Sequence, residues 1–169
     1  MRTIRAALGL ALFPALIACG GSNAGTVVTP GTGASPAATS VFTVGQTIKV
    51  GDNLLYTVTS VTAPYVSNNQ FDVPKNGQFL AVAVTFQNNG AKEVRISGLI
   101  SFSLRDASGQ SYDEAFVVGA PNPPDGAVAP GDKLAGTLVF DVPKNQHFKL
   151  YYTANIFSSG SVVVDLGTH

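Results

Sequence analysis

Residues that bind soft metals are scarce in this chain. Cysteine occurs once in 169 residues, tryptophan is absent, and the two histidines are His147 and the terminal His169. Copper and iron–sulfur sites need thiolates, thioethers or clustered imidazoles, which this sequence does not supply. We therefore expect no cofactor and no metal centre of this kind.

Charge is equally sparse. Ten basic and ten acidic side chains make up 12% of the sequence, and the basic ones are scattered singly along the chain. A surface for nucleic acid needs clustered Lys and Arg to neutralise phosphates. We therefore expect no nucleic-acid partner.

The N-terminal apolar run is too short to cross a membrane. Residues 6–17 follow Arg2 and Arg5, and a spanning helix needs about 20 apolar residues. A basic start followed by a short apolar run is typical of an export signal. The run ends at Leu16-Ile17-Ala18-Cys19, which resembles the lipobox of bacterial lipoproteins. In that motif the cysteine receives a diacylglycerol and becomes the first residue of the mature chain.

The resemblance predicts a lipoprotein signal peptide over residues 1–18 and lipid attachment at Cys19. The mature chain would carry eight basic and ten acidic residues, a net charge of −2. It would sit in the cell envelope, on the outer face of a bacterial membrane, held by two or more acyl chains. The alternative is an unmodified cysteine that merely follows a signal peptide.

Residues 19–40 are predicted to form the lipidated cysteine and a disordered tether. This segment consists almost entirely of Gly, Ser, Thr, Ala and Pro and carries no charge. Such a composition cannot bury enough apolar surface to fold, and about 21 flexible residues reach roughly 25 Å. We expect a spacer here rather than a binding motif.

Residues 41–169 are predicted to form one all-β domain. Short runs rich in Val, Ile, Thr, Tyr and Phe alternate with Gly, Asn, Asp and Pro, and no long helical periodicity occurs. Turns about every 8–15 residues favour an antiparallel β-sandwich. The expected strands are 47–50, 54–62, 79–87, 93–97, 100–105, 110–113, 115–118, 134–142, 148–154 and 161–166.

The ordered turn and strand motifs resemble a known family. They are Phe42-Thr43-Val44-Gly45, Gly51-Asp52, Gly77 to Val82, Asn88-Asn89-Gly90, Leu104 to Gly109, Tyr112-Asp113, Pro130-Gly131-Asp132 and Gly136 to Pro143. This set resembles bacterial lipoprotein and secreted domains of unknown function, whose fold is similar to the immunoprotective extracellular antigen of mycobacteria. The resemblance implies an immunoglobulin-like sandwich without catalytic residues. The last strand, after Ser158-Ser159-Gly160, has no counterpart in it.

The domain contains residues suited to two kinds of chemistry, serine hydrolysis and calcium binding. A serine nucleophile needs a histidine base, and His147 is the one internal histidine; it follows Pro143 in what is predicted to be a surface turn. Asp106, Ser108, Asp113 and Glu114 offer oxygen ligands for calcium, yet lack the regular spacing of a calcium loop. We expect neither an enzyme nor a metal site.

Aromatic residues in the two long loops are the best candidates for a binding surface. Tyr65 and Phe71 lie in the first loop, and Tyr112 and Phe116 border the second, proline-rich one. The competing explanation is that these rings cap the sandwich core. We expect a non-enzymatic binding or structural module whose partner is an envelope protein or glycan; the alternative is a divalent-ion or carbohydrate-binding accessory domain.

The lipid anchor gives a direct prediction. Cys19→Ser removes the sulfur that would carry the acyl chains, so the protein should leave the membrane fraction. Detergent partitioning and intact-mass measurement check this. A Cys19→Ser chain that stays equally membrane-bound would disprove lipid anchoring at this residue.

Overall fold

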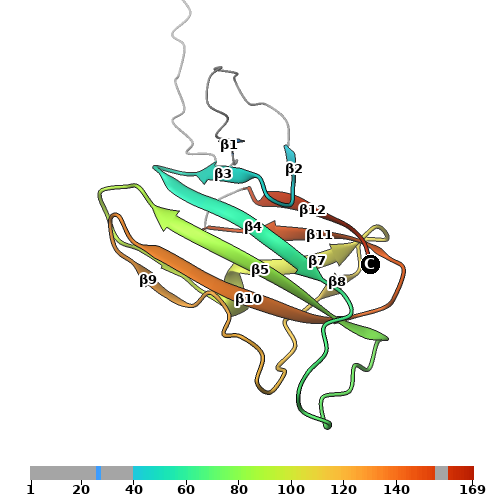
Figure 1. The fold of residues 1–169 in the computed structure, drawn as a ribbon. Helices are drawn as coiled ribbons and strands as arrows, with labels where there is room; N and C mark the ends of the chain where they lie inside the picture. The colour runs from blue at the N-terminus through green and yellow to red at the C-terminus, as the bar shows by residue number, and fades with distance from the viewer. Residues whose placement is uncertain (1–25, 28–39, 155–159) are drawn as a thin grey trace, which may run out of the picture.

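The structure is a computed structural model and describes residues 26–27, 40–154 and 160–169. Its strands form two five-stranded sheets and one small two-stranded sheet (Figure 1). The first sheet holds, in spatial order, β1 (Thr26–Val27), β3 (Thr47–Val50), β4 (Leu54–Thr62), β5 (Gln78–Asn88) and β10 (Lys133–Val142). The second holds β2 (Val41–Thr43), β12 (Val162–Thr168), β11 (His147–Tyr152), β7 (Phe102–Asp106) and β8 (Ser111–Tyr112). The predicted all-β sandwich is confirmed.

Alternation of apolar residues along the strands builds the core between the sheets. Leu54, Tyr56 and Val58 of β4 are buried, as the two-residue period of a strand requires. From the other sheet, Leu104, Leu150 and Val164 meet them in the same cluster. Burying each such side chain contributes about 1.5–3 kcal/mol.

Strands β5 and β10 are apolar on both faces over part of their length. They pair antiparallel at ten positions, from Lys133 opposite Gln87 to Val142 opposite Gln78. Phe79 and Ala81 of β5, with Val139 of β10, form a second buried cluster, separate from the main core. A strand buried on both faces needs cover on both, and two long loops provide it here.

Five elements differ from the sequence-based expectation. β2 was not expected, and it pairs parallel with β12, whereas all other pairs among the described strands are antiparallel. β9 (Gly126–Val128) lies inside the predicted proline-rich loop and pairs with β6 (Val94–Ile96). β1 lies inside the predicted tether and pairs with β3. Each of these strands is only two or three residues long, too short for an alternating pattern.

The fourth difference concerns residues 100–105, predicted as one strand with Ile100 pointing inward. Residues Gly98–Ser101 instead form a helical turn, α1, and Ile100 is 61% exposed. The strand begins only at Phe102. Residue 98, the first of this turn, lies against Pro123, and an added Cβ there would stand 2.8 Å from the proline ring, so the position requires glycine. Residues 115–118 also form a loop rather than a strand.

The predicted signal peptide and Cys19 lie outside the described residues, as does most of the predicted tether. Within the described ranges, no helix has the length and apolar character needed to cross a membrane.

Four rings fill one part of the main core. Tyr56 stacks on Phe86 with ring centroids 5.0 Å apart, and Phe102 and Tyr152 complete the group. The Tyr56 hydroxyl is buried, and no described residue forms a hydrogen bond with it. Burial raises the pKa of Tyr56 well above its usual value, because the charged form cannot be solvated there.

This hydroxyl predicts an unusual mutational result. A buried polar group without a partner destabilises the folded state, so Tyr56→Phe should raise the free energy of unfolding by about 1 kcal/mol. Tyr56→Ala, which leaves a cavity, should lower it by about 3–5 kcal/mol. Urea denaturation measures both. A clear loss of stability in Tyr56→Phe would contradict the assignment.

Candidate functional site

Two long loops lie together beside the β10 edge of the first sheet. Residues 63–77 connect β4 to β5, and residues 113–125 connect β8 to β9; both lie at the bottom of Figure 1. Their inner side chains, Tyr65, Ala115, Val117 and Ala120, pack on the second apolar cluster around Phe79 and Val139. The loops are therefore part of the folded body and not loose appendages.

The loops also use the hydrogen-bonding groups of the β10 edge. Ala115 N donates to Val139 O at 2.7 Å, and Thr137 N donates to Asn122 O at 2.9 Å. Further along the strand, the Asn76 side-chain amide donates to Asp141 O at 3.1 Å. The Asp141 carboxylate also accepts the backbone N–H groups of Lys75 and Asn76 at 2.7 and 3.0 Å. An edge strand normally leaves these groups to solvent or to another chain, and here both loops cover them.

Two glycines allow the proline-rich segment to approach the sheet. At Gly136 of β10, an added Cβ would stand 2.6 Å from the carbonyl carbon of Pro123 and 2.7 Å from Cα of Pro124. At Gly98 of α1, it would stand 2.8 Å from the Pro123 ring. No side chain fits in either place, so Pro123 lies directly against the backbone of both elements.

The Asp72 carboxylate ties the two loops to each other. Its Oδ2 accepts the Ser67 hydroxyl at 2.6 Å and the backbone N–H of Val118 at 3.0 Å. The Ser67 hydroxyl also lies 3.4 Å from Val118 O. These contacts join loop residues about 50 positions apart in the chain and fix the position of the apolar side chains beside them.

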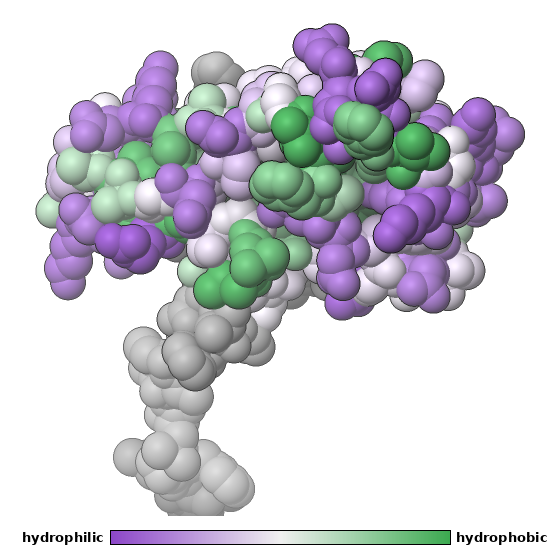
Figure 2. All heavy atoms as spheres, turned by 90° about the horizontal axis from the view of Figure 1, so that it is seen from below, coloured by the Kyte–Doolittle hydropathy of each residue, from purple (hydrophilic) through white to green (hydrophobic). Residues whose placement is uncertain are grey.

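Large apolar side chains on these loops face solvent. Phe71 is 82% exposed and Phe116 is 93% exposed. Their exposed neighbours in the two loops complete a surface that we call the loop face: Val66, Phe71, Val73, Phe116 and Val118. Figure 2 views the molecule from the loop side and shows hydrophobic side chains gathered there. Contiguous exposed apolar groups of this kind are typical of interaction sites.

The other two predicted aromatics have structural surroundings. Tyr65 is half-buried and packs on the second apolar cluster. The Tyr112 ring meets the buried Phe148 edge-on with centroids 5.9 Å apart, and its hydroxyl donates to Asp106 at 2.8 Å. Burial, and then the bond to the Asp106 carboxylate, raise the pKa of Tyr112 to about 12. The structure thus brings Phe71 and Phe116 to one face, and leaves Tyr112 outside it.

A groove of about 340 Å³ adjoins the loop face beside Phe116. Its walls are mainly apolar and include Leu99, Val117 and Pro121, while Glu114 and Asp125 supply carboxylates. Partial burial raises the pKa of Glu114, and the nearby charge of Asp125 raises it further. Sequence reasoning missed Leu99 and Asp125, because nothing along the chain signals that α1 and the proline-rich segment meet.

The acidic residues weighed as calcium ligands do not form one site. Asp106 Oδ1 accepts hydrogen bonds from Ser108 and Gln110 within its own turn, and the Ser108 side-chain bond is the main reason its pKa is lowered. Glu114 faces the groove instead. Across the part of the chain that the structure describes, no three of His, Cys, Asp and Glu come close enough to hold an ion.

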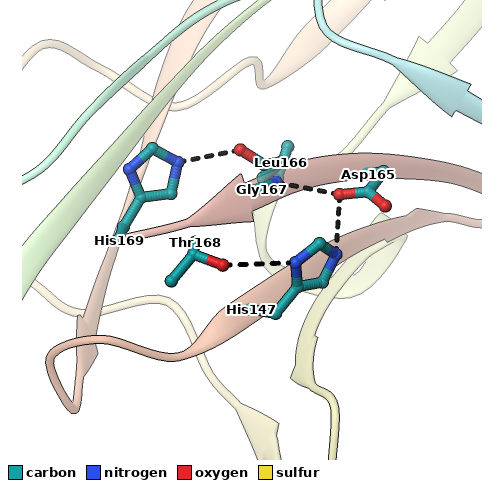
Figure 3. Close-up of polar contacts among 6 residues, drawn as sticks. All are labelled: His147, Asp165, Leu166, Gly167, Thr168 and His169. Carbon is teal, nitrogen blue, oxygen red and sulfur yellow. Dashed lines mark hydrogen bonds and ion pairs between the residues drawn. The ribbon is translucent and has the colours of Figure 1, made fainter.

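His147 lies on the outer face of the second sheet and not in a free turn. Figure 3 shows its ring between Asp165 and Thr168, with Nε2 2.9 Å from Asp165 Oδ1 and Nδ1 3.4 Å from Thr168 Oγ1. Burial by itself would raise the pKa of Asp165. The hydrogen bonds from Gly167 N and His147, together with the charges of His147 and Lys149, outweigh burial and lower this pKa. The distance to the exposed Thr168 is longer than an activated nucleophile needs. These contacts fasten the ends of β11 and β12.

Comparison with known proteins places the domain in a family. A model of the domain of unknown function DUF4352 matches residues 42–162. The chain belongs to the DUF4352 family. This match confirms the resemblance inferred from the ordered motifs, and it includes every residue of the loop face. No curated protein sequence matches the chain.

Solved structures share the fold of this DUF4352 domain. The yjhA protein of Bacillus subtilis is 26% identical over 75% of this chain and 99% of that chain, with a TM-score of 0.58. The ycdA protein of Bacillus subtilis, described as a candidate lipoprotein, is 16% identical over 69% of this chain and 37% of that chain, with a TM-score of 0.56. The secreted protein MPT63 of Mycobacterium tuberculosis is 17% identical over 73% and 85% of the two chains, with a TM-score of 0.48.

The close approach at Gly136 predicts a large effect from one methyl group. Gly136→Ala forces Pro123 and Pro124 away from β10 and should lower the free energy of unfolding by about 1–3 kcal/mol, the usual cost of overpacking. Ala135→Ser adds one heavy atom at the exposed neighbouring position and serves as control. Denaturation and limited proteolysis of residues 113–125 measure the effect. Equal stability of the two variants would contradict the close packing of Pro123 and Pro124 against Gly136.

Proposed function

We propose that this protein is a non-catalytic binding module, anchored outside the cytoplasm through Cys19, whose loop face binds a protein of the cell envelope. The observation that carries the binding role is the exposure of Phe71 and Phe116 on neighbouring, hydrogen-bonded loops. Each such ring can bury about 150–250 Å² in an interface. A few aromatic anchors of this kind supply most of the energy in typical interfaces.

Rigidity supports a binding role for these rings. Asp72 joins the loops, and the bonds from Ala115 and Thr137 hold the second loop on β10. A partner therefore meets a surface that is already ordered and pays less conformational entropy on binding. Aliphatic neighbours such as Val66 and Val73 favour an apolar protein surface over a glycan, which would ask for hydrogen-bonding side chains.

Sheet order supports a location for the face away from the membrane. β1, the described strand nearest to Cys19 in sequence, lies at one edge of the first sheet, and β10 lies at the other. Four interstrand spacings of about 4.8 Å separate them by roughly 19 Å. The export signal and the lipobox support the location itself, and the description of the structural relative ycdA as a candidate lipoprotein agrees with it.

Site-directed photocrosslinking in the native membrane tests the binding role. Benzoylphenylalanine replaces Phe116 in the full-length chain, and in a matched control it replaces Val44, an exposed apolar residue outside the two loops. We expect one discrete protein adduct from position 116 and none from position 44. Adding Phe71→Ala should lower the adduct yield about tenfold, because neighbouring anchors act together.

The opposite results are equally clear. Equal adducts from both positions, or a yield that Phe71→Ala leaves unchanged, would refute the loop face as a binding site. An adduct with carbohydrate in place of protein would favour the glycan alternative.

A further inference from the structure

The groove beside Phe116 combines apolar walls with uncompensated negative charge. Phe116 belongs both to the loop face and to the groove wall, so any partner seated on the loop face also meets the groove. Leu99 of α1 is 78% exposed and forms part of another wall. Glu114 and Asp125 are the titratable residues among the described lining.

Neither carboxylate has a cationic neighbour. Among the described residues, His147 and Asp165 form an ion pair, and no Lys or Arg lies within ion-pair distance of Glu114 or Asp125. Over the same residues, no side-chain hydrogen bond joins Glu114 or Asp125 to another group. Glu114 Oε2 lies next to Gly98, where it would stand 3.6 Å from an added Cβ. The groove thus presents two negative groups that the domain itself leaves unpaired.

The electrostatics of the groove agree with this description. Partial burial and the charge of Asp125 both disfavour ionised Glu114, which raises its pKa. A positive charge placed between the two carboxylates would relieve the repulsion and would gain from the reduced solvation.

We propose that the groove receives a Lys or Arg side chain of the protein partner, its methylene stem against Phe116 and Leu99 and its charge at Glu114 and Asp125. This inference rests on the proposed function, because it names the chemistry that the same surface recognises. Long basic side chains suit such a groove, since they lay an apolar stem along a wall while the charged end meets an acid. The Phe116 ring adds a favourable surface for a cation.

A metal ion fits this groove less well. Calcium takes six to eight oxygen ligands, whereas the remaining lining is largely aliphatic, aromatic or proline, with Asn122 and Thr137 as its polar members. A basic side chain needs only the two carboxylates and the apolar walls. The charge and the shape of the groove therefore favour an organic cation.

Peptide selection on the full-length chain in phosphatidylcholine nanodiscs tests the proposal. A random nonapeptide display library is selected against the wild type, against Glu114→Gln/Asp125→Asn, and against Phe71→Ala/Phe116→Ala, with empty nanodiscs subtracted. We expect wild-type selections to fix Lys or Arg at one position among apolar residues. Replacing that residue by norleucine in a synthetic peptide should weaken binding about tenfold, as loss of a charged hydrogen bond does.

The three selections separate the inference from the function beneath it. Two results would overturn the inference but keep the loop face as a binding site. In the first, the enriched peptides need Phe71 and Phe116 but carry no fixed basic residue; in the second, they bind the carboxylate variant as well as the wild type. If no peptide is enriched, or if enrichment survives the loss of both rings, the inference and the proposed function are both overturned.

Two controls guard the interpretation. The Glu114→Gln/Asp125→Asn variant should melt at the wild-type temperature or above it, because the double substitution removes the repulsion between the carboxylates and keeps the side-chain size. A lower melting temperature would assign the carboxylates a structural role and contradict the proposal. Calcium chloride titrated calorimetrically into the wild type should give no heat that depends on Glu114. Carboxylate-dependent calcium binding would reassign the groove to a metal.

Discussion

The contact of Pro123 with two glycine backbones is the constraint on which the candidate site depends. Gly136 opens space on β10 and Gly98 opens space on α1, so one proline touches two elements that no strand pairing connects. With the segment held there, Thr137 N reaches Asn122 O and Ala115 N reaches Val139 O. The position of Phe116, and the groove beside it, follow from these bonds.

The fold was predictable where strands are long and half-buried. The alternation of Leu54, Tyr56 and Val58, or of Leu138, Phe140 and Val142, marks one face of a strand whatever its neighbours are. A strand of two or three residues is too short to show this alternation by itself. β2 and β9, which were not expected, exist because neighbouring segments supply hydrogen-bond partners, so their positions depend on tertiary structure.

Ile100 shows why pattern alone misassigned one element. It falls in step with Phe102 and Leu104, and the alternation predicts an inward side chain. In the structure, residues 98–101 form α1, with Gly98 packed against Pro123, and Leu99 and Ile100 are exposed. The same limitation applies to the site: loop composition indicated the exposed rings Phe71 and Phe116, but not Leu99 or Asp125, which join them only through chain packing.

The first sheet has a two-residue strand, β1, at one edge, and the two loops cover β10 at the other. The outermost strands of the second sheet, β2 and β8, have three and two residues. Long bare edges are the templates on which proteins add to one another and aggregate. A protein confined to a membrane by acyl chains would meet copies of itself at a local concentration far above its average in the cell. Short or covered edges would let such a population crowd a surface as separate molecules, each with its loop face free for a different protein.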